Sequence, residues 1–231
     1  MAISNNKTLY FDRVARTKKL QTVNALAHAT YYSNGNKEET INCLGYYLDK
    51  IRDGGKGSYG EEGKDKKEQF DSQYTPGREF GVWTETRDEL VLTDLAKKMV
   101  EGKITPEYYI SNVMRNYYQI INNKVVNPLY SVLKFMDRTA KSNLYKEDIK
   151  NIKDFNLDST ERDNTGVLFN ILGDTVFFKR SNEKDKLVWS NIFSIKDVIN
   201  MCDITLLQEN VDDVKRKYSN QHIYANFITK D

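Results

Sequence analysis

Apolar positions recur at helical spacing through much of the chain and alternate with short strand-like runs. Residues 23–32 and 38–51 predict helices, and in the second Ile41, Leu44 and Leu48 return every three to four residues. Asn34-Gly35 after the first and Gly54-Gly55 after the second are typical of helix ends. Residues 53–67 carry five of the 12 glycines and almost no apolar side chain. We therefore expect a mobile surface loop there.

The middle of the chain predicts a helix, a hairpin and a capped helix in succession. Thr75-Pro76 is a favourable helix start, because proline suits a first turn. Residues 81–92 predict two strands around a polar tip at 85–88. Thr93 is placed to cap a helix over 94–100. This order is typical of winged-helix DNA-binding domains, although a hairpin beside a helix also occurs in other globular domains.

Two further helices are expected to form scaffold. Thr105-Pro106 begins a pattern of apolar positions that reaches Ile121, and Asn127-Pro128 precedes a helix over 129–136. Residues 122–124 predict the turn between them.

The last third repeats the earlier order of elements. Residues 145–152 and 158–172 predict two helices, and strands over 175–180 and 187–189 flank a polar tip at 181–186. The predicted fold class is mainly α with small β-hairpins (α+β), with two tandem winged-helix-type subdomains. The first is expected over residues 1–138, including a helical extension, and the second over 139–231.

Composition restricts the partner only weakly. The 35 Lys and Arg residues nearly balance 33 Asp and Glu, which gives a net charge of +2. A local basic face, and not the net charge, decides affinity for phosphates. Cys43 and Cys202 are expected to be buried thiols, and neither a signal peptide nor a membrane span is predicted. We expect a cytoplasmic protein.

No catalytic or metal-binding residue is predicted. The three Asp/Glu-x-Lys tripeptides, at 62–64, 101–103 and 213–215, do not fall on predicted strands with an upstream Asp, as a PD-(D/E)xK nuclease would need. His28 and His222 lack neighbours at metal-ligand spacing. We expect no cofactor in this chain.

If the chain binds DNA, the predicted second helix of each unit offers base-reading side chains near its start. The candidates for base reading are Gln73, Tyr74, Thr75, Arg78, Thr160, Glu161, Arg162, Asn164 and Thr165. Cations in the N-terminal segment and around the second wing suit phosphates. These candidates are Arg13, Arg16, Lys18, Lys19, Lys179, Arg180 and Lys184.

Residues 74–136, with LTDLAK at 92–97 and Asn-Pro-Leu at 127–129, resemble the N-terminal recognition region of type IIS restriction and nicking endonucleases of the AlwI-like family. The resemblance implies tandem winged-helix subdomains that read a short asymmetric site in double-stranded DNA as a monomer. It also implies a separate C-terminal PD-(D/E)xK domain that cuts with Mg²⁺. Such a domain would begin where this chain stops, at Asp231, so an isolated recognition domain or a fragment is expected.

Two alternatives remain open. A stand-alone winged-helix regulator or defence-system DNA binder would dimerise on a palindromic site. An interaction domain would use the same units to bind protein.

Overall fold

The computed structural model describes residues 3–11, 18–63, 65–85, 89–157 and 164–230. The α-helices are α1 (Lys19–Tyr32), α2 (Lys37–Ile51), α3 (Lys66–Glu79), α4 (Asp94–Val100), α5 (Pro106–Asn116), α6 (Pro128–Arg138), α7 (Lys146–Lys150), α8 (Thr165–Gly173), α9 (Ile195–Met201), α10 (Val211–Lys217) and α11 (Gln221–Ile228). The strands are β1 (Ser4–Asn6), β2 (Trp83–Glu85), β3 (Leu90–Leu92), β4 (Gln119–Ile121), β5 (Lys124–Val126), β6 (Asn143–Tyr145), β7 (Phe178–Arg180) and β8 (Lys186–Trp189). Two 3-10 turns are η1 (Lys153–Phe155) and η2 (Thr205–Gln208). In the described parts of the chain, no helix combines the length and apolar character that crossing a bilayer requires.

Side-chain caps explain why several helices begin where they do. The side chains of Asn36, Thr93, Thr105 and Asn127 accept hydrogen bonds from backbone N–H groups in the first turns of α2, α4, α5 and α6. Each cap satisfies a donor that the helix itself leaves without a partner. The predicted starts of these four helices are confirmed to within a residue.

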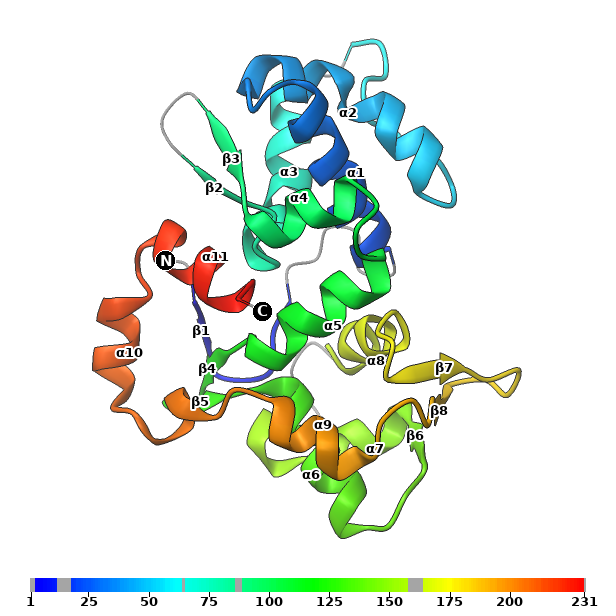
Figure 1. Cartoon of the computed structure of the whole chain (residues 1–231), viewed down its shortest axis with the longest axis vertical. Coiled ribbons are helices and arrows are strands. Elements are labelled where there is room, and N and C mark those ends of the chain that lie inside the picture. Colours follow the sequence, from blue (N-terminus) through cyan, green and yellow to red (C-terminus); the bar gives the residue numbers. More distant parts are fainter. Residues whose placement is uncertain (1–2, 12–17, 64, 86–88, 158–163, 231) are drawn as a thin grey trace.

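Helices α1 to α4 and the β2–β3 hairpin form one end of the molecule, at the top of Figure 1. Asn36, between α1 and α2, forms an antiparallel bridge with Glu89, next to β3. Gly35 precedes it with a φ of +79°, and an added Cβ would lie 2.6 Å from the carbonyl oxygen of Leu90. Only glycine therefore allows the chain to pass this close to β3.

Helix α3 begins earlier than the sequence predicts. Asp65 caps it, with its Oδ1 accepting from the backbone N–H of Lys67 at 2.7 Å. Pro76 lies inside the helix, so the prediction that Thr75-Pro76 opens a helix is wrong. The preceding Gly-rich loop is attached to α2, because the buried Tyr59 donates its hydroxyl to the carbonyl of Ile41 at 2.6 Å. Mobility of this loop stays a prediction.

Helix α5 crosses the centre of the molecule and ends at Asn116, so the predicted continuation to Ile121 is wrong. Residues 119–121 form β4 instead, which pairs with β5 in an antiparallel hairpin and with β1 in parallel. Asn122 and Asn123 have φ angles of 45° and 59°, as a tight hairpin turn requires. The predicted turn at 122–124 is confirmed.

Helices α6 to α9 and the sheet β6-β8-β7 form the opposite end. The central strand β8 pairs antiparallel with both neighbours. Each end of the molecule thus has a helix, a short extended segment, two helices and a hairpin in sequence. In both ends the extended segment pairs with the second strand of the hairpin, through Asn36 in one and β6 in the other.

The C-terminal segment returns to the first half of the chain. Helix α11 packs against β2, α5 and α3. Buried Tyr224 donates its hydroxyl to the carbonyl of Tyr118 at 3.0 Å, and Asn112 Nδ2 donates to the carbonyl of Lys230 at 2.7 Å. Residues near 230 are therefore part of the structure that supports α3.

Candidate nucleic-acid interface

One stripe along α3 carries five side chains that are partly or fully exposed. Lys67 and Asp71 are exposed, and Tyr74, Thr75 and Arg78 are partly exposed. Spacings of three and four residues place these five on one stripe of the helix. The structure thus brings three of the sequence candidates together. It adds Lys67, which lies in the first turn of α3 and not in the preceding loop where the sequence places it.

Tyr74 lies between two cations. The Lys37 ammonium is 5.6 Å from the centre of its ring, and the Arg78 guanidinium carbon is 5.8 Å from it. Such cation–π contacts favour a defined position for each positive group. Lys37 belongs to the first turn of α2, so this second helix contributes charge next to the α3 stripe.

Next to this stripe, α3 packs on the β2–β3 hairpin through the Trp83 ring. Trp83 is fully buried and stands over Gly77, where an added Cβ would lie 2.4 Å from Cη2 of the ring. The Tyr74 ring is 5.4 Å from the Trp83 ring. The absence of a side chain at Gly77 therefore sets how closely the helix and the hairpin approach.

The structure corrects the prediction for Lys19. Its side chain is 1% exposed, and its Nζ lies 3.3 Å from Oε2 of Glu79 at the end of α3. The other carboxylate oxygen of Glu79 accepts from the Tyr117 hydroxyl at 2.9 Å. A cation buried in this way cannot also contact a phosphate at the surface. Lys19 instead fixes the C-terminal end of α3.

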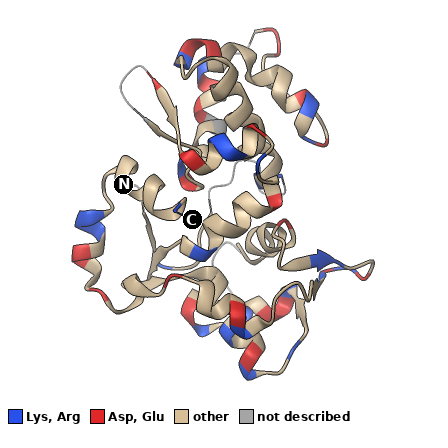
Figure 2. Ribbon diagram, viewed as in Figure 1, with Lys and Arg blue, Asp and Glu red and all other residues tan. Residues whose placement is uncertain are grey.

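The cations of the second hairpin are exposed. Lys179, Arg180 and Lys184 lie on β7 and in the turn before β8, and Figure 2 shows this hairpin projecting from the molecule with its basic strand. Arg180 is 2.7 Å from Asp174 Oδ1 and also donates to the carbonyl oxygen of Asn170 at 3.0 Å. These bonds attach the base of the hairpin to the end of α8. Burial raises the pKa of Asp174, and the neighbouring Arg180 opposes that rise.

Asn164 and Thr165 are also corrected. Both are buried, and Oδ1 of Asn164 accepts from the backbone N–H of Phe11 at 3.4 Å. Helix α8 begins at Thr165, and not at residue 158 as predicted. Asn164 and Thr165 both face the core at its start. Five candidates lie outside the described residues, and so does the side chain of Gln73. These five are Arg13, Arg16, Thr160, Glu161 and Arg162.

One cavity of about 500 Å³ is lined by both Lys18 and Arg180, although these residues are far apart in the sequence. Lys18 forms an ion pair of 2.6 Å with Asp53. The cavity lies where α1 and α2 meet α8 and the base of the second hairpin. Two of the predicted phosphate contacts are therefore neighbours, each with a carboxylate partner.

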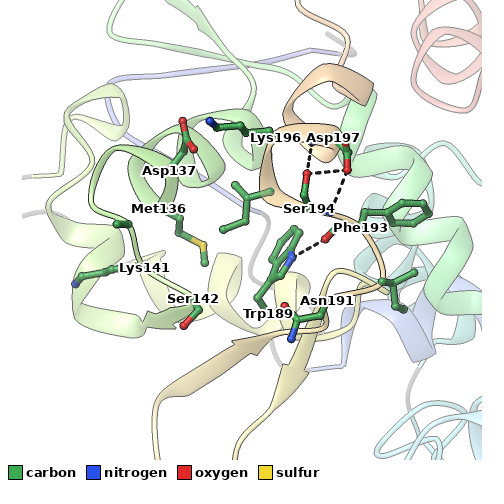
Figure 3. A pocket seen from close by; sticks show the side chains of 13 residues that line it. Met136, Asp137, Lys141, Ser142, Trp189, Asn191, Phe193, Ser194, Lys196 and Asp197 are labelled. Atoms are coloured by element: carbon green, nitrogen blue, oxygen red, sulfur yellow. Dashed lines mark hydrogen bonds between the residues drawn. The ribbon is translucent and has the colours of Figure 1, made fainter.

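A larger cavity, of about 740 Å³, lies between the end of α6 and the loop before α9 (Figure 3). The Trp189 indole donates to the carbonyl of Phe193 at 2.8 Å, and Ser194 and Asp197 cap α9. Ile192 is largely exposed at its rim. These hydrogen bonds fix the loop before α9 and the start of that helix.

The described residues contain no group of three His, Cys, Asp or Glu side chains that could bind a metal ion. Cys43 and Cys202 are both free thiols. Cys202 is buried and Cys43 is half-buried. Burial raises the pKa of Cys202 to about 12, so neither this cysteine nor its surroundings suit nucleophilic chemistry at neutral pH.

Neither a known protein family nor a curated protein sequence matches the chain. A solved structure has a similar fold, described as a crystal structure of pyrene- and phenanthrene-modified DNA in complex with the BpuJ1 endonuclease binding domain. The TM-score is 0.59, and the similarity covers 89% of this chain and 91% of the other. At 11% sequence identity, the match establishes a shared α+β fold.

Proposed function

We propose that this chain recognises a short asymmetric sequence in double-stranded DNA as a monomer, as the target-recognition part of a type II restriction endonuclease. In this proposal the residues of the chain supply no cleavage chemistry. Mg²⁺ would be needed only by a nuclease domain elsewhere in the parent enzyme.

The repeated order of elements carries the proposal. We assign α1, α2, α3 and the β2–β3 hairpin to one winged-helix unit, and α6, α7, α8 and the β7–β8 hairpin to a second. This assignment moves α6 out of the first subdomain predicted over residues 1–138 and into the second unit. In both, a short extended segment after the first helix pairs with the second hairpin strand. In winged-helix proteins the third helix enters the major groove, and the hairpin contacts the adjacent backbone. Helix α3 has a polar, partly cationic stripe suited to that position.

The similar structure supports the same assignment, because it is a binding domain of an endonuclease that was solved with DNA. Its match covers 89% of this chain and 91% of the other. Two different units in one chain also suit an asymmetric site, whereas a palindrome suits two identical half-sites.

The proposal is tested by binding the chain to a randomised duplex pool. Fluorescence anisotropy measures the binding, and the bound fraction is then sequenced. We expect one asymmetric consensus and an affinity that falls with salt. A palindromic consensus with a dimeric complex would instead support a stand-alone regulator. Absence of salt-sensitive binding would reject DNA recognition and favour the interaction-domain alternative.

Arg78→Ala tests the α3 stripe directly. If Arg78 reads a base, its loss weakens specific binding by roughly 1–3 kcal/mol and leaves binding to random DNA nearly unchanged. Arg216→Ala is the matched control, since Arg216 is an exposed arginine on α10 that pairs with Asp213. Equal losses on specific and random duplexes would reassign Arg78 to a phosphate. Arg162→Ala, outside the described residues, is predicted to behave like Arg78→Ala.

A further inference from the structure

A second basic surface lies away from the α3 stripe, between α4 and α11. Four lysines, Lys97, Lys98, Lys103 and Lys230, line one groove of about 670 Å³. Figure 2 shows basic positions of α4 and the end of the chain gathered in this region. The two carboxylates that line the same groove are Asp94 and Glu101, and Asp203 outside its lining pairs with Lys230. The four lysines still exceed these three carboxylates, so the groove carries an excess of positive charge.

Glu101 forms an ion pair with one of these lysines, Lys103. Its Oε2 lies 2.5 Å from Nζ of Lys103, and this hydrogen bond lowers the pKa of Glu101, with a further contribution from Lys97. Both side chains of this ion pair are substantially exposed, at 66% for Lys103 and 32% for Glu101. An exposed pair of this kind exchanges partners easily, because water screens it. A phosphate can therefore take the place of the carboxylate.

The groove is continuous with the first hairpin. Lys97 lines both this groove and a neighbouring cavity of about 410 Å³ beside β3, which Glu89 and Val91 also line. A phosphate backbone that contacts the β2–β3 hairpin would therefore reach Lys97 next, and then the rest of the groove. Successive lysines along a groove suit a polyanion of regular charge spacing better than a single small anion.

We infer that the groove between α4 and α11 is a phosphate-contact surface that follows the DNA backbone beyond the β2–β3 hairpin. The inference rests on the proposed function, and it adds contacts that carry no sequence information. Glu101 pairs with Lys103 when DNA is absent and competes with the backbone for this lysine. Removing the lysines therefore weakens binding, and removing the Glu101 charge strengthens it.

The test measures the affinity of the full chain for a random-sequence 20-base-pair duplex at several salt concentrations. Lys97→Ala/Lys103→Ala is expected to reduce the salt slope by about 1.8, at about 0.9 for each lost contact, and to weaken binding about 8-fold per contact at 0.1 M salt. Glu101→Gln is expected to tighten binding and steepen the slope. Lys215→Ala is the matched control, since Lys215 pairs with Asp212 on α10, away from the groove.

An unchanged salt slope in the double variant, with a thermal midpoint equal to that of the unaltered chain, would overturn the inference. So would weaker binding by Glu101→Gln, because a structural role of the ion pair predicts that sign. Failure of the unaltered chain to bind any duplex would instead reject the proposed function. If the double variant unfolds, the sign of the Glu101→Gln effect alone decides.

Discussion

Gly77→Ala tests how α3 is held against the β2–β3 hairpin. The new Cβ would lie 2.4, 2.7 and 3.0 Å from three carbons of the Trp83 ring, where carbon atoms normally stay about 3.5–4.0 Å apart. The ring is fully buried and has the Tyr74 ring 5.4 Å away, so it cannot move aside without disturbing the core. Helix and hairpin must therefore separate.

The two contributions to stability have opposite signs. Overpacking a core by one methyl group typically costs about 1–3 kcal/mol. Replacing glycine by alanine within a helix returns about 0.5–1 kcal/mol. We expect a net loss of roughly 1–2 kcal/mol, which lowers the thermal midpoint by roughly 2–8 °C for a chain of this size. Urea unfolding and a thermal scan measure both quantities.

Gly45→Ala is the matched control, because Gly45 also lies inside a helix and has space around it. Its added Cβ would meet Cδ1 of Tyr59 at 3.4 Å, an ordinary contact. This substitution is expected to stabilise the protein by about 0.5–1 kcal/mol. If both substitutions raise the thermal midpoint, the Trp83 ring does not limit the approach of α3, and the reasoning is refuted.

Three further predictions concern buried charge, acid and metal. Lys19→Ala is expected to cost about 3–5 kcal/mol in urea unfolding, because it removes the buried cation that pairs with Glu79. Lys19→Met/Glu79→Gln should recover most of that loss. Burial alone would raise the pKa of Asp203, but hydrogen bonds from Lys230 and Thr205 outweigh it and lower the pKa to about 2. The Asp203 carboxylate therefore stabilises the fold above about pH 4 by ~1 kcal/mol after solvent screening, and this stabilisation is lost as the pH falls toward 2. An Asp203→Asn variant whose unfolding has the same acid sensitivity would contradict this prediction. The purified chain is expected not to cut DNA with Mg²⁺, and cleavage that a single carboxylate substitution abolishes would show a missed nuclease site.

Local signals in the sequence predict much of the fold. The caps at Thr93, Thr105 and Asn127 and the turn at 122–124 are correct, since each depends on residues within a few positions of one another. The hairpins over 81–92 and 175–189 are correct for the same reason. The predicted helix start at Thr75 is wrong because the Asp65 cap was read as part of a loop, although the proline at 76 fits inside the helix.

Long-range pairing could not be predicted in this way. The parallel pairing of β1 with β4 joins residues more than a hundred positions apart, and no pattern in the six residues involved requires it. The burial of Lys19 depends on Glu79 and Tyr117, which belong to two other segments. Asn164 looked like a surface residue because the predicted helix began too early. The sequence thus predicts DNA contacts for Lys19 and Asn164, whereas both side chains are buried in contacts with other segments.

The two proposed units differ in how much of their third helix can meet a groove. Helix α3 has a stripe from Lys67 to Arg78 that is partly or fully exposed, whereas in α8 only Gly166, Asn170 and Gly173 are partly exposed. Two of these three have no side chain, and the Asn170 side chain accepts from Arg180 at 3.3 Å. A helix of this kind cannot read several base edges, because direct readout needs side chains with donors and acceptors. Under the proposed function, base reading along the regular helices would therefore fall mainly on α3, and the exposed lysines of the second hairpin would contact the backbone. That unequal division is itself a reason to expect an asymmetric site, since neither unit can substitute for the other.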